Sequence, residues 1–444
     1  MDPDRGVGQR RHKRDAIDVG MRLLAPVISS DFLDRRGLRD PLNRFLKIVV
    51  QKGFSAAGAT TRQFKKVQGL GKAPTRLAPN TADYFDLTPD DDQRMIVETV
   101  KEFAAEILRP AARKADDSAT YPPDLIAKAA ELGVTAIKVP EDFDGIAEQR
   151  STVTNALVAE ALAYGDMGLA LPILAPGGVA AALTQWGNAD QQATYLKEFA
   201  GEHVPQACVA IAEPHPLFDP TALKTTAVRT PSGYRLDGVK SLVPAAADAE
   251  LFVVAAQLNG RPAMFIVEAS SPGVTVTADP SMGIRAAALG RVELRRVSVP
   301  LEARLGEDAD YSEVIALSRL GWAALAVGTS QAVLDYVIPY IKEREAFGEP
   351  IARRQSVAFM CADIAIELDG LRLVTWRGAA RADGGLPFAR EAALARKLAA
   401  DKGMRIGLDG VQLLGGHGFT KEHPVERWYR DLRAIGVAEG VVVL

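Results

Sequence analysis

From about Phe85 to Glu202 the spacing of apolar residues predicts helices, because these residues recur three and four positions apart. One such stripe consists of Ile96, Val97, Val100, Phe103, Ile107 and Leu108, and a second of Leu125, Ile126, Ala129 and Leu132. Proline is poorly tolerated inside a helix, so the helices are expected to be separated at Pro122, Pro123 and Pro140. Asn188 is a candidate N-cap for the last helix of this segment.

From about Pro205 to Pro300 the pattern changes to short runs rich in β-branched and aromatic residues, which predict strands. Three of these runs begin at Leu251, Ala263 and Val274, and turn signals stand at Pro231-Ser-Gly233 and Asn259-Gly260. Strands at roughly ten-residue spacing without helices between them are typical of an antiparallel sandwich or barrel.

From about Ser312 onward the pattern is helical again, in three long stretches at 312–342, 355–383 and 387–413. Long helices joined by short loops pack as an antiparallel bundle. The predicted fold class is therefore α+β. It comprises an all-α N-terminal domain, an antiparallel β-barrel or sandwich as the middle domain, and a C-terminal antiparallel four-helix bundle. The expected boundaries are 85–204, 205–305 and 306–444. The absence of βαβ alternation excludes a Rossmann fold.

Residues 1–84 are expected to form a basic N-terminal extension, in part helical. Residues 1–80 carry 17 Lys/Arg and 7 Asp/Glu, a net charge of +10, whereas the remainder carries 36 and 49, a net of −13. Residues 41–72 contain seven basic residues, no acid, and apolar positions at helical spacing. This segment is either a solvated leader or a helix that docks on an acidic partner or on anionic lipid. Nucleic acid is not expected as a partner, because the interleaved aromatics of a stacking platform are absent.

The composition of the 444 residues, with 48% hydrophobic and 25% charged, is that of a soluble globular protein. Cys208 and Cys361 cannot form a disulfide framework, so we expect a cytoplasmic protein in which both are small buried hydrophobes. Apolar runs long enough to span a membrane are not apparent, and the N-terminus lacks the apolar core of a signal peptide.

A search for isolated catalytic motifs is negative. The five histidines, His12, His203, His215, His417 and His423, are expected to lie far apart and show no metal-ligand spacing with the cysteines, so no metal site is expected. Neither a Gly-x-Ser-x-Gly elbow nor a phosphate-binding glycine loop between a strand and a helix is present. Taken alone, Gly415-Gly416-His417-Gly418 is interpreted as a helix stop.

From about residue 85 onward the chain nevertheless resembles the acyl-CoA dehydrogenase family. The resemblance rests on six elements that occur in the family's order and at similar distances. These are Gly187–Leu196 with Gly201-Glu202; Ala212-Glu213-Pro214; Met282–Arg285 with Val292-Glu-Leu and Val297–Pro300; Arg344-Glu-Ala-Phe347-Gly348 with Gln355; Gln412–Gly418; and Pro424–Arg427 with Arg430-Asp431 and Glu439-Gly440.

The resemblance implies α,β-dehydrogenation of an acyl-CoA thioester. A carboxylate removes the α-proton, while the β-hydrogen leaves as hydride to the flavin of FAD. An electron-transfer flavoprotein is the implied electron acceptor, and a homodimer or homotetramer the implied assembly. Glu439 is the implied base. It is the only ionisable group in residues 435–444, whose apolar side chains are expected to desolvate it and raise its pKa. Some relatives carry the base on an earlier helix, where this chain has Ser318.

The resemblance also implies binding residues. Those expected at the adenine and pyrophosphate side of FAD, partly from a neighbouring subunit, are Arg344, Phe347, Gln355, Gln412 and Gly416, and Ala212 is expected beside the flavin. Those expected to contact the substrate are Arg319, on its CoA side, and Phe218. Arginine offers a forked donor to phosphate oxygens, and glycine permits close backbone approach.

The flavin-ring side departs from the family pattern. Residues 212–219 read Ala-Glu-Pro-His-Pro-Leu-Phe-Asp in place of Thr-Glu-Pro-Gly-x-Gly-Ser-Asp, and Leu242-Val-Pro244 replaces Trp-x-Thr. Val441 replaces the usual threonine. Two alternatives therefore stay open: a dehydrogenase-derived binding or assembly protein with weakened or lost flavin chemistry, and an oxidase-like relative that passes electrons to oxygen. The acyl chain length and the choice between CoA and a carrier protein also stay open.

Overall fold

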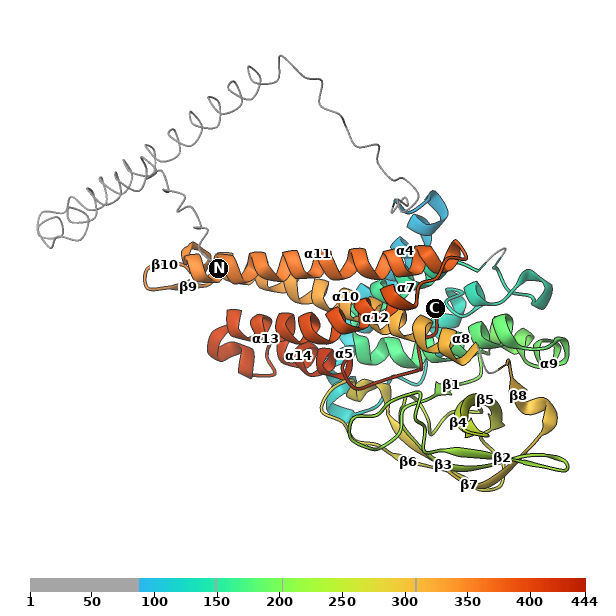
Figure 1. Cartoon of the computed structure of the whole chain (residues 1–444). Coiled ribbons are helices and arrows are strands. Elements are labelled where there is room, and N and C mark those ends of the chain that lie inside the picture. Colours follow the sequence, from blue (N-terminus) through green and yellow to red (C-terminus); the bar gives the residue numbers. More distant parts are fainter. Residues whose placement is uncertain (1–87, 148–149, 202, 308–309) are drawn as a thin grey trace, which may run out of the picture. The chain divides into compact units, whose positions relative to one another are not determined.

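The structure, a computed structural model, describes residues 88–147, 150–201, 203–307 and 310–444 (Figure 1). The predicted basic extension, 1–84, and its segment 41–72 lie outside the described residues. The three predicted regions of secondary structure are present in the predicted order: helices, then a sheet, then long helices. This confirms the α+β fold class.

The N-terminal helices begin with α4 (Asp91–Phe103), which continues through a π turn (Ala104–Leu108) into α5 (Arg109–Ser118). Four further helices follow: α6 (Leu125–Glu131), α7 (Thr152–Gly165), α8 (Met167–Trp186) and α9 (Ala189–Ala200). The predicted N-cap is confirmed, because the side chain of Asn188 accepts a hydrogen bond from the Gln191 N–H at 2.9 Å. The Gln191 side chain in turn accepts from the Asn188 N–H, which completes a capping box.

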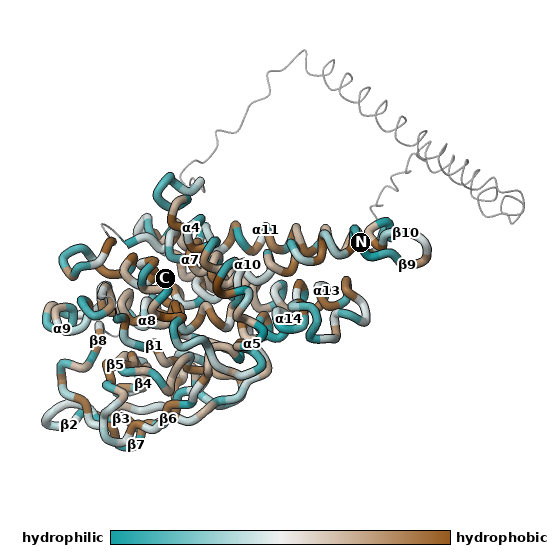
Figure 2. Tube along the Cα trace, turned by 180° about the vertical axis from the view of Figure 1, so that it is seen from behind, coloured by the Kyte–Doolittle hydropathy of each residue, from teal (hydrophilic) through white to brown (hydrophobic). Residues whose placement is uncertain are grey.

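Helix α8 is the most apolar element of this part. By length and composition it could span a membrane, with a mean hydropathy of 1.6, so the expectation that no apolar run is long enough is wrong. However, 89% of that stretch is buried inside the protein, as in the core helix of a globular domain. In Figure 2 the hydrophobic segments gather around α7, α8 and the C-terminus.

The middle of the chain forms an eight-stranded sheet. Its strands are β1 (Ala207–Ala210), β2 (Thr226–Thr230), β3 (Gly233–Val243), β4 (Leu251–Leu258), β5 (Arg261–Glu268), β6 (Val274–Ala278), β7 (Gly290–Pro300) and β8 (Arg304–Leu305). The order is β6-β7-β3-β2-β4-β5-β8, and β1 pairs with β4. Both views place this sheet on the side of α8 and α9 that faces away from α11 (Figures 1 and 2).

The predicted turns are confirmed, but the sheet is not wholly antiparallel. Asn259 and Gly260, both at positive φ, join β4 to β5 in a two-residue hairpin. In contrast, β4 pairs in parallel with both β1 and β2. The sequence pattern did not reveal these parallel pairs, since the periodicity of a strand carries no information on the direction of its neighbour.

The C-terminal helices are α10 (Asp310–Glu343), α11 (Gln355–Asp383), α12 (Ala389–Leu398), α13 (Met404–Leu413) and α14 (Val425–Ala434). A π turn at Ala399–Gly403 joins α12 to α13, so the predicted third long helix is one rod with a local irregularity. The expectation for the cysteines holds for Cys208, which is buried, whereas Cys361 on α11 is only partly buried.

Candidate functional site

Glu439 lies in the loop after α14 and is 7% exposed. Gly440, at φ +80°, forms an antiparallel bridge with Ala210, and the Val441 N–H donates to the Val209 carbonyl at 3.0 Å. The loop therefore pairs with the edge of β1. Because β1 leads directly into residues 212–219, this pairing brings the segment of the candidate base next to the segment that the resemblance assigns to the flavin.

Helix α10 holds the same loop from its other side. The Ser318 hydroxyl donates to the Gly440 carbonyl at 2.7 Å, and the Trp322 indole N–H donates to it at 2.9 Å. Both side chains are buried. Ser318 thus positions the main chain beside Glu439.

Two arginines face the Glu439 carboxylate. Oε1 accepts from Arg319 Nη2 at 2.9 Å and from Nε at 3.2 Å, whereas Oε2 has a weaker contact with Nε at 3.4 Å. Arg396 Nη2 lies 3.7 Å from Oε1, and it also donates to the Ala438 carbonyl. The apolar neighbours that the local sequence predicts are therefore accompanied by two cations, which α10 and α12 contribute and local sequence does not show.

A buried ion pair joins Glu213, in the loop at 212–219, to Lys240, with Lys240 Nζ 2.8 Å from Glu213 Oε1. Burial alone would raise the pKa of Glu213, but the charge of Lys240 and hydrogen bonds from Lys240 and two backbone N–H groups lower it to about 2. Burial lowers the pKa of Lys240 to about 8, although Glu213 opposes that shift. The pair anchors the start of the loop to β3, in which Lys240 lies.

The other residues of this loop have contacts with β3, with each other and with α10. Ala212 is buried, and its carbonyl accepts from the Ser241 N–H at 2.9 Å. Phe218 is partly buried, edge-on to the ring of His215. The Tyr311 hydroxyl donates to the Pro220 carbonyl at 2.7 Å, and burial raises its pKa, as do the nearby carboxylates of Glu439, Glu213 and Asp219. Tyr311 thus holds the end of the loop at Pro220 to the start of α10.

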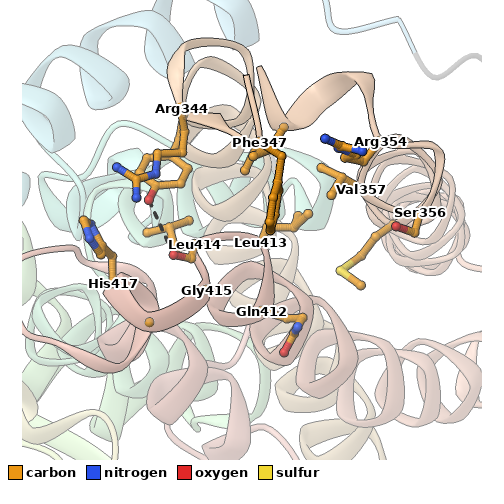
Figure 3. A pocket seen from close by; sticks show the side chains of 14 residues that line it. Arg344, Phe347, Arg354, Ser356, Val357, Gln412, Leu413, Leu414, Gly415 and His417 are labelled. Carbon is orange, nitrogen blue, oxygen red and sulfur yellow. Dashed lines mark hydrogen bonds between the residues drawn. The ribbon is translucent and has the colours of Figure 1, made fainter. Parts of the chain in front are cut away.

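A second site is a cavity of about 670 Å³ between the N-terminal end of α11 and the loop after α13 (Figure 3). Of the five residues expected around the adenine and pyrophosphate, Arg344, Phe347, Gln412 and Gly416 line it. Gln355 does not, although its neighbours Arg354 and Ser356 do. In Figure 3 Arg344 and His417 lie on one side of the cavity, and Arg354 and Ser356 on the other.

Phe347 is held in an unusual conformation at the edge of this cavity. It occupies the turn between β9 (Glu345–Ala346) and β10 (Glu349–Pro350), at φ +57°, and is 93% exposed. A bulky residue rarely adopts positive φ, and such strain is found at functional sites. The Arg354 guanidinium lies 5.5 Å from the centre of its ring. The turn therefore presents a flat aromatic face next to a cation.

The groups around the cavity suit a ligand that carries phosphate and a flat ring. Arg344 and Arg354 supply guanidinium donors, and Phe347 a stacking surface. At Gly415 and Gly416 an added Cβ would meet no atom within 4 Å, so a ligand can reach the backbone there. Different segments of the chain form this cavity and the surroundings of Glu439. Among the described residues, none of those that line the cavity also contacts Glu439.

Three family models match the chain in the order of its three parts. The acyl-CoA dehydrogenase N-terminal domain matches residues 90–203, the middle domain 208–297, and the C-terminal domain 310–441. The chain belongs to the acyl-CoA dehydrogenase family. Membership makes it an oxidoreductase that acts on a CH–CH bond.

Relatives within the acyl-CoA dehydrogenase family agree over most of their lengths. The mitochondrial short-chain specific acyl-CoA dehydrogenase of Mus musculus is 30% identical over 366 residues, 79% of this chain and 87% of its own. An acyl-CoA dehydrogenase of Bacillus subtilis is 30% identical over 79% of this chain and 94% of its own. The structure of butyryl-CoA dehydrogenase from Megasphaera elsdenii superposes with a TM-score of 0.74 at 28% identity, covering 80% and 96% of the two chains.

The sequence did not predict several residues that lie near Glu439 or line the cavity at the start of α11. Arg396 and Tyr311 approach Glu439 from α12 and from the start of α10, and Arg354 and His417 line the nucleotide-side cavity. Arg354 stands directly before Gln355 and could have been found from that position. Arg396 carries no local signal, because only the tertiary packing of α12 brings it to Glu439.

Proposed function

We propose that this chain is an FAD-dependent acyl-CoA dehydrogenase that converts an acyl-CoA thioester to the 2-enoyl-CoA and passes the electrons to an electron-transfer flavoprotein. The observation that carries the proposal is the placement of Glu439. Its loop pairs with β1 at Ala210, directly before the flavin-side segment, and an arginine holds its carboxylate. A similar structure, named for an electron transferring flavoprotein of Acidaminococcus fermentans, supports the acceptor class at 29% identity and a TM-score of 0.74.

The nucleotide half of FAD fits the cavity at the start of α11. Arg344 and Arg354 would hold the diphosphate, Phe347 would stack on the adenine, and Gln412 and Gly416 would complete the wall. Bound FAD would supply the acceptor for the substrate's β-hydrogen. On the ring side, Ala212 and Pro244 offer no side-chain hydroxyl, and Pro244 also lacks a backbone N–H, so neither residue would supply these donors to the flavin ring.

Glu439 acts as the base that removes the α-proton. Oε1 accepts the two shorter bonds from Arg319, so it is the atom that fixes the carboxylate. Oε2 has only the 3.4 Å contact and is the atom available to receive the proton. Arg319 and Arg396 orient the group, and the buried position of Glu439 excludes bulk water from the transfer.

A short acyl group is the proposed substrate class. Trp322, which donates to the Gly440 carbonyl, and Val441–Val443 are buried, so the chain beside Glu439 is closely packed. We take this close packing as support for a short acyl chain. The relatives named short-chain specific, at 30% identity, support the same choice.

The second candidate is a dehydrogenase-derived binding or assembly protein. The observation that favours it is the altered ring-side segment, in which Leu242 and Ala245 are at positive φ, and Leu217 is 99% exposed. Such a protein would retain the fold but hold FAD weakly.

Product analysis separates the two candidates. The full chain is incubated with added FAD, an artificial electron acceptor and acyl-CoAs from four to sixteen carbons, and the products are identified by mass spectrometry. Loss of two hydrogens from the shorter substrates supports the dehydrogenase. Unchanged substrates at every length, under conditions in which the protein is folded, support the binding protein. Peroxide formed without the acceptor would identify an oxidase-like relative.

A further inference from the structure

Three side chains with metal-ligating groups meet at the loop between α13 and α14. The candidate ligand atoms of His417, Glu422 and His423 all lie within 4.8 Å of one another. The expectation that the histidines lie far apart is wrong for this pair, whose rings stack with their centres 5.7 Å apart. We infer that this His-Glu-His cluster is a binding site for a divalent transition-metal ion. The inference does not depend on the proposed dehydrogenase activity.

The local fold explains why residues six apart come together. Residues Gly415–Phe419 form a 3₁₀ turn, and the His417 carbonyl accepts from both the N–H and the hydroxyl of Thr420, at 3.1 and 2.9 Å. A Cβ at Gly418 would lie 2.2 Å from the Val411 carbonyl oxygen, so only glycine lets this turn pack so closely on α13. The chain then reverses before α14, which returns Glu422 and His423 to His417.

His423 is already oriented as a metal ligand. Its Nδ1 is hydrogen-bonded to the Tyr336 hydroxyl at 2.7 Å, and the ring of Tyr340 packs edge-on against it, with 5.6 Å between ring centres. A metal-ligating histidine commonly uses one ring nitrogen for such a bond, which fixes the ring and leaves the other nitrogen for the ion. Nε2 of His423 is then the ligand atom. The Tyr336 contact is a second observation, independent of the proximity of the three residues.

The ligand set selects the class of ion. Two imidazoles and one carboxylate suit Zn²⁺, Co²⁺ or Ni²⁺, whereas Ca²⁺ and Mg²⁺ prefer oxygen ligands alone. His417 and Glu422 are exposed and can rotate inward to bring the donors to the roughly 2 Å that zinc bonds require. Three protein ligands leave one tetrahedral position for water or another small donor.

A metal ion bound at this cluster would affect the neighbouring cavity. His417 also lines the cavity that contains Arg344 and Gly416. An ion that ties His417 to His423 would fix this wall of the cavity against α14. It would also place a positive charge at the rim of a pocket suited to phosphate.

The test measures metal binding directly. The full chain, without an affinity tag and with its bound cofactor if any, is titrated with ZnCl₂ by calorimetry, and Co²⁺ is added as a spectroscopic probe of tetrahedral geometry. Wild type is expected to bind one Zn²⁺ per chain. His417→Ala, His423→Ala and Glu422→Gln are each expected to weaken binding at least tenfold. Tyr336→Phe keeps every ligand and is expected to weaken binding about tenfold through the loss of ring orientation.

Two histidines outside the cluster provide matched controls. His215→Ala and His12→Ala are expected to leave the Zn²⁺ affinity unchanged. The inference is overturned if the His417→Ala/His423→Ala double variant binds Zn²⁺ as tightly as wild type, or if wild type takes up no Zn²⁺ beyond that double variant. Circular dichroism of each variant verifies that the fold is retained. Glu422→Gln, at an exposed position, and Tyr336→Phe, which removes only a hydroxyl, keep the test available if a histidine variant fails to fold.

Discussion

Arg319 on α10 and Glu439 after α14 are 120 residues apart in the chain and form a forked ion pair, with Nη2 2.9 Å and Nε 3.2 Å from Oε1. The pair joins the candidate base to the helix that also holds the Gly440 carbonyl through Ser318. Helix α10 thus determines the orientation of the Glu439 side chain, and pairing with β1 determines the course of the main chain around it.

Arg319 is therefore expected to act by positioning Glu439. Arg319→Gln should lower kcat about 100-fold, because the carboxylate loses its forked donor and misplacement of a reacting group is costly. Arg319→Lys keeps the positive charge but not the forked pair of donors, so its kcat should lie between those of wild type and Arg319→Gln. Steady-state kinetics with the preferred acyl-CoA checks this. Arg390→Gln, an exposed residue of α12, is the control, and equal kcat for Arg319→Gln and wild type would contradict the assignment.

Arg344 is expected to bind the diphosphate of FAD. Arg344→Ala should weaken FAD about 10- to 100-fold, since a charge-assisted hydrogen bond contributes about 1.5–3 kcal/mol. Flavin fluorescence titration of the apoprotein measures the affinity. Arg353→Ala is a matched control, because that arginine is 71% exposed and does not line the cavity. If the two variants bind FAD alike, Arg344 is not a flavin ligand.

The sequence predicted the order of elements well, because periodicity is a local property. The N-cap at Asn188 and the turn at Asn259-Gly260 follow from side chains within a few residues, and both are confirmed. The parallel pairing of β1 with β4 and the contact of Arg396 with Glu439 depend on segments far apart in the chain. No local pattern encodes them, and the resemblance supplied no residue at either position.

We expect that only glycine at position 321 allows α10 to pack closely against the main chain at Val442. A Cβ at this position would lie 2.3 Å from the Val442 carbonyl oxygen, whereas at Gly370 on α11 it would meet nothing within 4 Å. Gly321→Ala should therefore destabilise the protein by about 1–3 kcal/mol and disturb the Glu439 loop. Gly370→Ala should stabilise it by up to about 1 kcal/mol, because alanine favours a helix. Urea unfolding at pH 7 measures both, and a similar loss of stability in both would contradict the close approach.

Asp431 is expected to make stability depend on pH. Burial, together with the charge of Asp166, raises its pKa to about 8, whereas an unfolded aspartate has a pKa of about 3.9. The folded state therefore holds a proton that the unfolded state releases, and this contribution is lost as pH rises towards 8. The slope is at most about 1.4 kcal/mol per pH unit.

Asp431→Asn removes this titration. The difference in the free energy of unfolding between the variant and wild type should move in favour of the variant from pH 5 to pH 8, and then level off. Chemical unfolding at a series of pH values provides the data. Asp363→Asn, exposed on α11, should show no such trend. A difference that stays constant across the range would show that Asp431 is not the titrating group.

The role of Glu439 as the base is tested by the visible spectrum of FAD-loaded protein during anaerobic addition of butyryl-CoA, for wild type and for Glu439→Gln. We expect a flavin spectrum in both proteins, rapid bleaching in wild type, and bleaching slowed about 100-fold or more in the variant, because removal of a positioned base costs about 10²–10⁴ in rate. Equal bleaching rates in the two proteins, or failure of the wild type to take up FAD, would contradict it.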